Sequence, residues 1–190
     1  MIAPSTLSKL KSIVGQDNYF DSSENKLVYS YDGTPLLSQL PDAIVRPQSK
    51  EQISSIVQLA NKERFAIVPR GSGSGLSGGS IPTEDSIVLL TNHWNKIIEI
   101  DQRNLAAWVE PGVITAQLQY EVESLGLFYP PDPGSSAIST LGGNVAENAG
   151  GLRGLKYGVT KNYILGMEVV LPNGDVVLLG RKISQRCCRI

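Results

Sequence analysis

Apolar side chains recur at helical intervals near the start of the chain. Leu7, Leu10 and Val14 are spaced for one face of a helix, and the pattern ends at a glycine, a residue that often terminates helices. We therefore expect a helix over Ser5–Val14. The following residues, 16–42, are polar and rich in turn-forming types, and they show little periodicity.

A strand, a helix and a second strand are predicted next. Ala43–Arg46 is a short apolar run that a proline ends, and Phe65–Val68 is a second short apolar run. Between them, Ser49 and Gln52 have the spacing of a capping box, in which two side chains satisfy amides at a helix start. The helix that follows carries one apolar stripe, made of Ile53, Ile56, Val57 and Ala60. A βαβ unit of this length predicts that its two strands are parallel.

Beyond residue 86 the pattern predicts antiparallel strands. Three strand-like runs follow one another with short connections, as in a meander: Ile87–Thr91, Lys96–Asp101 and Leu105–Glu110. A helix is expected over Thr115–Leu125. Two further strands, Met167–Leu171 and Val176–Leu179, flank Pro-Asn-Gly-Asp, which favours a tight hairpin turn. The predicted fold class is therefore α+β, with a small parallel βαβ lobe and a larger antiparallel lobe.

The composition fits a folded protein and excludes several functions. Hydrophobic residues make up 41% and charged residues 18% of the 190 residues, which excludes a disordered chain. Acids and bases number 18 and 17, so the net charge of −1 gives no electrostatic basis for binding nucleic acid. No apolar run approaches the roughly 20 residues of a membrane span. One histidine and two adjacent cysteines provide neither a His-based metal site nor a disulfide framework, so we expect no metal and a cytoplasmic location.

The last ten residues differ from the rest of the chain. Residues 181–190 hold four basic side chains, no acidic one and both cysteines. We therefore expect three segments: an N-terminal helix and lead-in over 1–38, one domain over 39–180, and an atypical basic tail over 181–190.

Glycine is concentrated in two segments, and the first of them is 69–79. Its sequence PRGSGSGLSGG contains a formal G-x-G-x-x-G at Gly73, Gly75 and Gly78. A dinucleotide-binding Rossmann fold needs a helix that opens within the glycines, but Ser80-Ile81-Pro82 follows here, which cannot start a long helix. Two interpretations remain: a loop whose successive backbone N–H groups form a nest for a phosphate or diphosphate, and a flexible surface loop.

The second glycine-rich segment runs from Pro130 to Gly151 and on through Tyr157-Gly158. Ser139 or Thr140 is placed to cap a short helix over Leu141–Asn148, whose start would present free amides to an anion. The alternative is a purely structural loop. Two amide-rich segments with few basic side chains favour a bulky diphosphate cofactor that is bound mostly by backbone.

Several stretches recur in the order that one known family has. They are PDAIVRPQSKEQISSIVQLAN, PRGSGSGLSGG, VEPGV, PPDPGSS with LGGNVAENAGG, KYG and EVVLPNGDVV, and they cover about residues 25 to 180. The sequence resembles the FAD-binding, PCMH-type module of the vanillyl-alcohol oxidase superfamily. More narrowly, it is similar to the FAD-linked subunit of bacterial glycolate oxidase and to the related D-lactate dehydrogenases.

The resemblance implies a set of cofactor-binding residues. Gly71 to Gly75 would hold the FAD diphosphate through backbone amides, and the second segment would lie along the diphosphate and the flavin. The implied residues are Arg70, Gly71, Ser72, Gly73, Ser74, Gly75, Pro131, Asp132, Ser135, Thr140, Gly142, Gly143, Asn144, Asn148, Gly150, Gly151, Tyr157, Gly158 and Ile164. Related proteins that attach flavin covalently have a histidine in the first loop, where this chain has Ser74. The resemblance therefore implies non-covalent FAD.

The resemblance also implies an activity. Full-length members oxidise a 2-hydroxy acid, such as glycolate or D-lactate, by hydride transfer to the flavin, and partner oxidase subunits are possible. Their substrate domain follows the matched region, whereas here the resemblance stops at Gly180. We therefore expect a truncated product of a frameshift or gene interruption that is inactive alone, and its catalytic residues stay unassigned. The alternatives are a stand-alone, non-catalytic flavin- or nucleotide-binding protein and a non-functional remnant.

Overall fold

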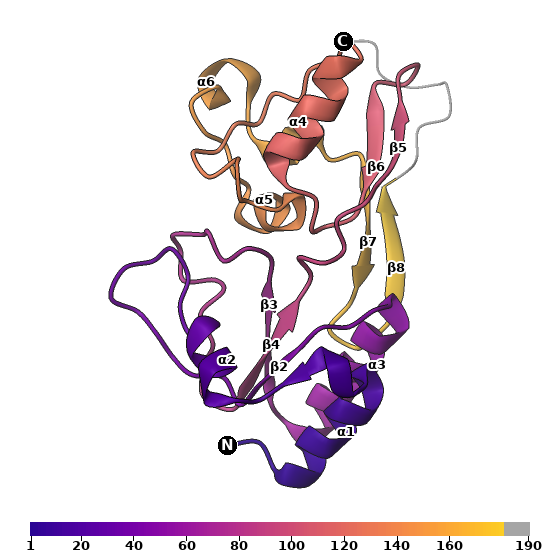
Figure 1. Ribbon diagram of the computed structural model, residues 1–190. Helices are drawn as coiled ribbons and strands as arrows, with labels where there is room; N and C mark the ends of the chain where they lie inside the picture. The colour runs from indigo at the N-terminus through magenta and orange to yellow at the C-terminus, as the bar shows by residue number, and fades with distance from the viewer. Residues whose placement is uncertain (181–190) are drawn as a thin grey trace. The chain divides into compact units, whose positions relative to one another are not determined.

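The computed structural model describes residues 1–180, and the chain divides into two compact units (Figure 1). Unit 1 comprises residues 1–91 and 169–177, and unit 2 comprises residues 92–168 together with 178–180. The predicted basic tail lies outside the described residues. The domain limits after residues 38 and 180 stay predictions.

Unit 1 contains a four-stranded sheet with the order β1-β2-β4-β3, formed by β1 (Tyr19–Phe20), β2 (Ala43–Val45), β4 (Ser86–Leu90) and β3 (Ala66–Arg70). The predicted parallel direction of β2 and β3 is confirmed, because each runs parallel to β4, which lies between them. The short strand β1 pairs antiparallel with β2.

The strand β4 corrects one prediction. It was expected to begin an antiparallel meander, but it is the central parallel strand of unit 1. All five of its residues are buried. A strand that is apolar on both faces is typical of a parallel sheet with both faces covered, and this pattern outweighs the short connection to the next strand.

Helices α1 (Pro4–Val14) and α3 (Lys50–Glu63) lie side by side in unit 1 (Figure 1). Their apolar faces share one core with β2 and β4, in which Leu10, Ile56 and Ile87 are fully buried. Ser49 caps α3 as predicted, because its hydroxyl accepts the Gln52 N–H at 3.3 Å.

Two details of unit 1 differ from the sequence patterns. The Gln52 side chain accepts the N–H of Gln48 at 2.7 Å, and Gln48 lies one residue before the capping position.

The polar stretch 16–42 contains short elements that its weak periodicity did not indicate. They are a 3-10 helix (Gln16–Asn18), β1 and α2 (Ser23–Val28).

Unit 2 is built from an antiparallel strand pair and several short helices. The predicted strands pair as β5 (Ile97–Asp101) and β6 (Ala106–Val109). The predicted helices form as α4 (Thr115–Ser124) and α5 (Leu141–Glu147), and α6 (Gly154–Tyr157) and a 3-10 helix (Thr160–Tyr163) follow. A small apolar core joins them through Val113, Leu118, Val122 and Leu141.

The predicted hairpin closes the described part of the chain. It consists of β7 (Gly166–Val170) and β8 (Val176–Gly180). Its turn is held by hydrogen bonds from the Leu171 N–H to the Asp175 carbonyl and from the Gly174 N–H to the Leu171 carbonyl, both at 2.8 Å. Among residues 1–180, every helix is too short or too polar to cross a bilayer.

Candidate functional site

The first glycine-rich segment leaves the end of β3 in unit 1 as a loop. Residues 71–80 form bends and turns without a helix, so the Rossmann geometry is absent from this described stretch, as the sequence predicts. Within residues 1–180, the N–H groups of Gly71 through Leu76 donate no hydrogen bond. A run of uncommitted main-chain donors is what an anion nest requires.

Arg70 lies beneath this loop rather than in it. Its side chain is buried, with 7% of the residue exposed, and its Nη1 donates to the carbonyl of Tyr31 at 2.6 Å. The guanidinium carbon lies 5.5 Å from the centre of the Tyr29 ring, which is within cation–π range. Burial lowers the pKa of the guanidinium, and the negative charge of Asp32 opposes that shift. Arg70 thus supports the loop from inside the unit.

The loop fits closely around this arginine. Gly73 has φ +71°, and a Cβ built there would lie 2.2 Å from Nη2 of Arg70. Only glycine accepts both this left-handed backbone and the close guanidinium. A Cβ on Gly33 would lie 2.7 Å from the Gly75 carbonyl, so the loop also lies directly against the segment 29–34.

Asp32 fixes the far end of the loop. This residue is 8% exposed, and its two carboxylate oxygens accept the N–H of Thr34 at 2.8 Å and the N–H of Ser80 at 3.3 Å. The Thr34 hydroxyl in turn accepts the Gly78 N–H at 2.8 Å. Sequence reasoning missed this support. Its signal is the Asp32-Gly33-Thr34 sequence, because Asp side chains bond the backbone two residues on in turns.

In unit 2, the structure brings two parts of the second segment together. The Asp132 N–H donates to the Gly150 carbonyl at 3.1 Å, and Asp132 forms a parallel bridge with Gly151. Gly151 has φ +94°, and a Cβ there would lie 1.7 Å from the Asp132 carbonyl oxygen. Gln119 of α4 donates to the Pro131 carbonyl at 2.9 Å. The chain therefore places Pro131 and Asp132 beside the glycine pair.

The start of α5 corrects a second prediction. Of the two predicted capping residues, Thr140 caps the helix, because its hydroxyl accepts the Gly143 N–H at 3.3 Å. However, the preceding amides are not free. The Leu141 N–H donates to the Val113 carbonyl at 2.8 Å, and the Gly142 N–H donates to the Pro111 carbonyl at 2.7 Å. The prediction of a free anion-binding helix start was wrong, because the 111–113 segment packs against it.

Asn144 is buried at the centre of a polar network. It is 3% exposed, and its amide donates to the Thr115 hydroxyl at 2.6 Å. That hydroxyl lies 2.9 Å from the Ser139 hydroxyl. Ser135, nearby in sequence, accepts the N–H of Ser139 with its carbonyl at 2.7 Å. These contacts hold α5 against the start of α4.

The remaining predicted residues surround the 3-10 helix Thr160–Tyr163. Asn148 is exposed and left-handed, and its side chain accepts the Lys161 N–H at 3.0 Å. The carbonyl of Tyr157 accepts the Tyr163 hydroxyl at 2.5 Å, and a Cβ on Gly158 would lie 2.7 Å from the Asn162 side chain. Gly150 and Ile164 are partly buried.

One charged residue beside these positions was not predicted. Arg153 lies with its Nε 3.4 Å from Asp132 Oδ2 and its guanidinium carbon 5.2 Å from the centre of the Phe128 ring. The Nη1 of Arg153 is buried and has no hydrogen-bond partner among the described residues. The sequence signal is an arginine that follows the Gly150-Gly151 pair.

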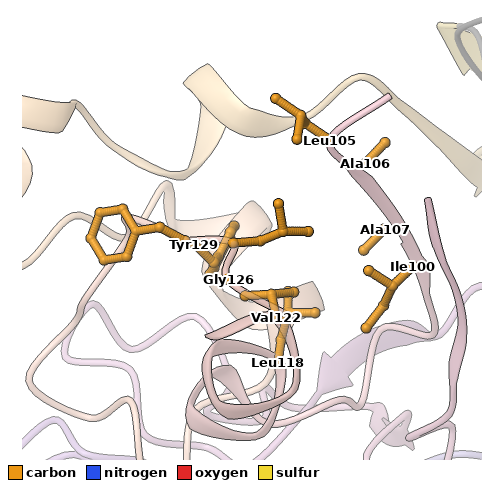
Figure 2. Close-up of a pocket in the computed structure, with 10 residues that line it drawn as sticks. Ile100, Leu105, Ala106, Ala107, Leu118, Val122, Gly126 and Tyr129 are labelled. Carbon is orange, nitrogen blue, oxygen red and sulfur yellow. The ribbon is translucent and has the colours of Figure 1, made fainter. Parts of the chain in front are cut away.

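Unit 2 also contains a cavity of about 300 Å³, and Phe128, whose ring lies near Arg153, is part of its lining. Figure 2 shows side chains from β5, β6 and α4 pointing toward it, and the 126–129 stretch completes the lining. Its lining is mostly apolar, and burial raises the pKa of Tyr129 at its edge to about 12. None of the predicted cofactor-binding residues lines this cavity.

Comparison of the sequence with known proteins identifies similar flavoproteins. The family described as "FAD binding domain" matches residues 41–180. The chain is 52% identical to glycolate oxidase subunit GlcD of Bacillus subtilis over 185 residues, which cover 97% of this chain and 39% of that protein. It is 36% identical to D-2-hydroxyglutarate dehydrogenase of Stutzerimonas stutzeri, covering 96% of this chain and 39% of that protein. The chain thus spans about two fifths of the length of these relatives.

Solved structures share the fold. An alkyldihydroxyacetonephosphate synthase superposes with a TM-score of 0.83 at 25% identity, covering 96% of this chain and 36% of that chain. A p-cresol methylhydroxylase superposes with a TM-score of 0.79 at 29% identity, covering 92% and 34%. The predicted PCMH-type fold is therefore confirmed.

Two of the features described above suit FAD, and a third, the start of α5, does not. The uncommitted amides of the 71–76 loop suit a diphosphate, and the buried, unpartnered Nη1 of Arg153 suits an oxygen acceptor. The start of α5 does not fit an anion, because its amides are already bonded. With the family match over residues 41–180, these features lead to one conclusion: the chain belongs to the FAD binding domain family.

Proposed function

We propose that this chain binds FAD non-covalently, as the flavin module of an oxidoreductase that acts on a 2-hydroxy acid of the glycolate or D-lactate class. The match of residues 41–180 to the FAD binding domain family carries the proposal. Its physical support is the 71–76 loop, whose main-chain donors have no other acceptor within the described chain.

Specific residues would hold the cofactor. The amides of Gly71 to Gly75 would bind the diphosphate, and Arg70 acts as a positioning residue that shapes the loop through Gly73. Pro131, Asp132 and the 148–158 segment would form a further wall. When bound, FAD supplies a flavin ring that accepts a hydride from the substrate carbon.

The substrate class is proposed from the relatives. Glycolate oxidase subunit GlcD and D-lactate dehydrogenase of Anaerostipes hadrus are among them, the latter 39% identical. Because the chain spans about two fifths of GlcD, we propose that turnover requires the rest of that length. The name of GlcD also supports a role beside partner subunits. The cytoplasmic location stays a prediction from the sequence.

The purified chain is expected to be yellow and to release all of its flavin on denaturation. Ser74 offers no nucleophilic ring nitrogen to the flavin, so no covalent bond should form. The measurement is the visible absorbance of the supernatant and of the washed pellet after acid precipitation. Flavin that stays with the pellet would contradict non-covalent binding, and a chain that takes up no added FAD would contradict the proposed function.

A second measurement separates a catalytic module from a flavin-binding protein. D-lactate or glycolate is added to the FAD-loaded chain without oxygen, and the flavin absorbance is followed. We expect no bleaching, because we propose that turnover requires the rest of the relatives' length, which this chain does not span. Bleaching would contradict that proposal and would show that the chain is catalytic on its own.

A further inference from the structure

The guanidinium of Arg153 has an incomplete set of partners. Its Nε contacts Asp132 Oδ2 at 3.4 Å, and its guanidinium carbon lies 5.2 Å from the centre of the Phe128 ring. Phe128 in turn meets Tyr157 edge-on, with ring centres 5.5 Å apart. We call these four residues, Phe128, Asp132, Arg153 and Tyr157, the Arg153 cluster.

The unmet donor of this cluster is Nη1. That atom is buried, and no described residue offers it an acceptor. Buried donors without a partner are rare in folded proteins, because each forfeits the hydrogen bonds that water would provide. An acceptor supplied by a ligand removes that cost.

The remaining geometry allows the arginine to meet a ligand. Its side chain is 40% exposed, and that of Asp132 is 27% exposed. The 3.4 Å contact is longer than the roughly 2.7–2.9 Å of a tight charge-assisted hydrogen bond. The contact with Asp132 is therefore looser than a tight ion pair and leaves the guanidinium with hydrogen-bonding capacity for a further oxygen.

The Arg153 cluster lies next to residues that are predicted to bind the cofactor. Asp132 is bridged to Gly151, and both are among the predicted cofactor-binding residues. The planar fork of arginine matches a pair of oxygens on a phosphate or carboxylate better than lysine does. Asp132 contacts the guanidinium at Nε and balances its charge, but the buried Nη1 has no hydrogen-bond partner among the described residues.

We propose that Arg153 is an oxyanion receptor, which takes a phosphate or carboxylate oxygen of a bound ligand and is positioned by Asp132 and Phe128. The inference rests on the proposed function in one respect: that function supplies the two candidate ligands whose oxygen Arg153 would bind. These are the diphosphate of FAD and the carboxylate of a 2-hydroxy acid.

The first experiment observes the arginine directly in the whole chain. The ¹⁵Nε signal of Arg153 is assigned by its loss in Arg153→Lys and is followed while diphosphate, FAD or D-lactate is added. A saturable shift with diphosphate and FAD supports a phosphate source, and a shift with D-lactate supports a carboxylate source. No shift with any of the three overturns the proposal.

The second experiment measures affinity. Arg153→Gln should weaken binding of the responding anion by about 10- to 100-fold. The matched control is Arg103→Gln, an exposed arginine of the same unit, which should leave the dissociation constant unchanged. Equal affinity of wild type and Arg153→Gln overturns the proposal, as does an equal loss in both variants.

These outcomes are separable from the proposed function. If FAD binds tightly and Arg153→Gln has no effect, the receptor proposal fails and FAD binding stands. If diphosphate shifts the Arg153 signal but FAD does not bind, the receptor proposal stands and the proposed function fails.

Discussion

Replacing Gly151 with alanine is expected to lower the free energy of unfolding by at least about 3 kcal/mol. The new Cβ would lie 1.7 Å from the carbonyl oxygen of Asp132, and the backbone there is left-handed with φ +94°. A methyl group at that distance forces the 131–132 and 150–151 segments apart, which breaks the bond from the Asp132 N–H to the Gly150 carbonyl. Urea denaturation followed by circular dichroism measures the loss.

Gly134 provides the matched control for this substitution. It lies in the same glycine-rich segment, it is exposed, and a Cβ built on it meets no atom within 4 Å. Gly134→Ala should change the free energy of unfolding by no more than about 0.5 kcal/mol. Similar denaturation midpoints for Gly151→Ala and Gly134→Ala would contradict the described packing of Asp132 on Gly151.

Replacing Gly73 with alanine is expected to weaken FAD binding by at least about 100-fold. A left-handed backbone costs an alanine about 1–2 kcal/mol, or roughly tenfold in affinity. The Cβ would also lie 2.2 Å from Nη2 of the buried Arg70, so either the loop or this guanidinium, which is bonded to Tyr31, must shift. Titration of the apoprotein with FAD, followed by quenching of flavin fluorescence, gives the dissociation constant.

Gly78→Ala separates the two causes. Gly78 is also left-handed, with φ +74°, but the nearest atom to its Cβ position is a methyl of Ile81 at 3.8 Å. This variant carries the backbone strain without the clash, so we expect a loss of about 10-fold. Equal losses for Gly73→Ala and Gly78→Ala would show that contact with Arg70 does not shape the loop.

Local sequence signals predicted the elements of the fold well. The Ser49 cap, the apolar stripe of α3 and the Asn173-Gly174 turn each depend on residues close in sequence, and the structure confirms all three. The place of β4 was wrong, because strand pairing was inferred from connection length. The continuous burial of Ser86–Leu90 was the better signal for a central parallel strand.

The candidate site was less predictable, because its supports are distant in sequence. The helix start at Leu141 is satisfied by carbonyls of 111–113, a pairing that no local pattern encodes. Likewise, Arg70 depends on Tyr31, in a stretch whose polar composition indicated only turns. Family resemblance supplied the glycine positions, whereas the partners that hold them came only from the structure.

The central claim is that main-chain N–H groups of the first loop bind the diphosphate of FAD. The most direct measurement is the backbone ¹⁵N–¹H spectrum of the chain during titration with FAD. The account predicts that the signals of Gly71, Ser72, Gly73, Ser74 and Gly75 shift together and reach a plateau at one equivalent of cofactor. If FAD binds to saturation while these five signals stay in place, the claim is contradicted.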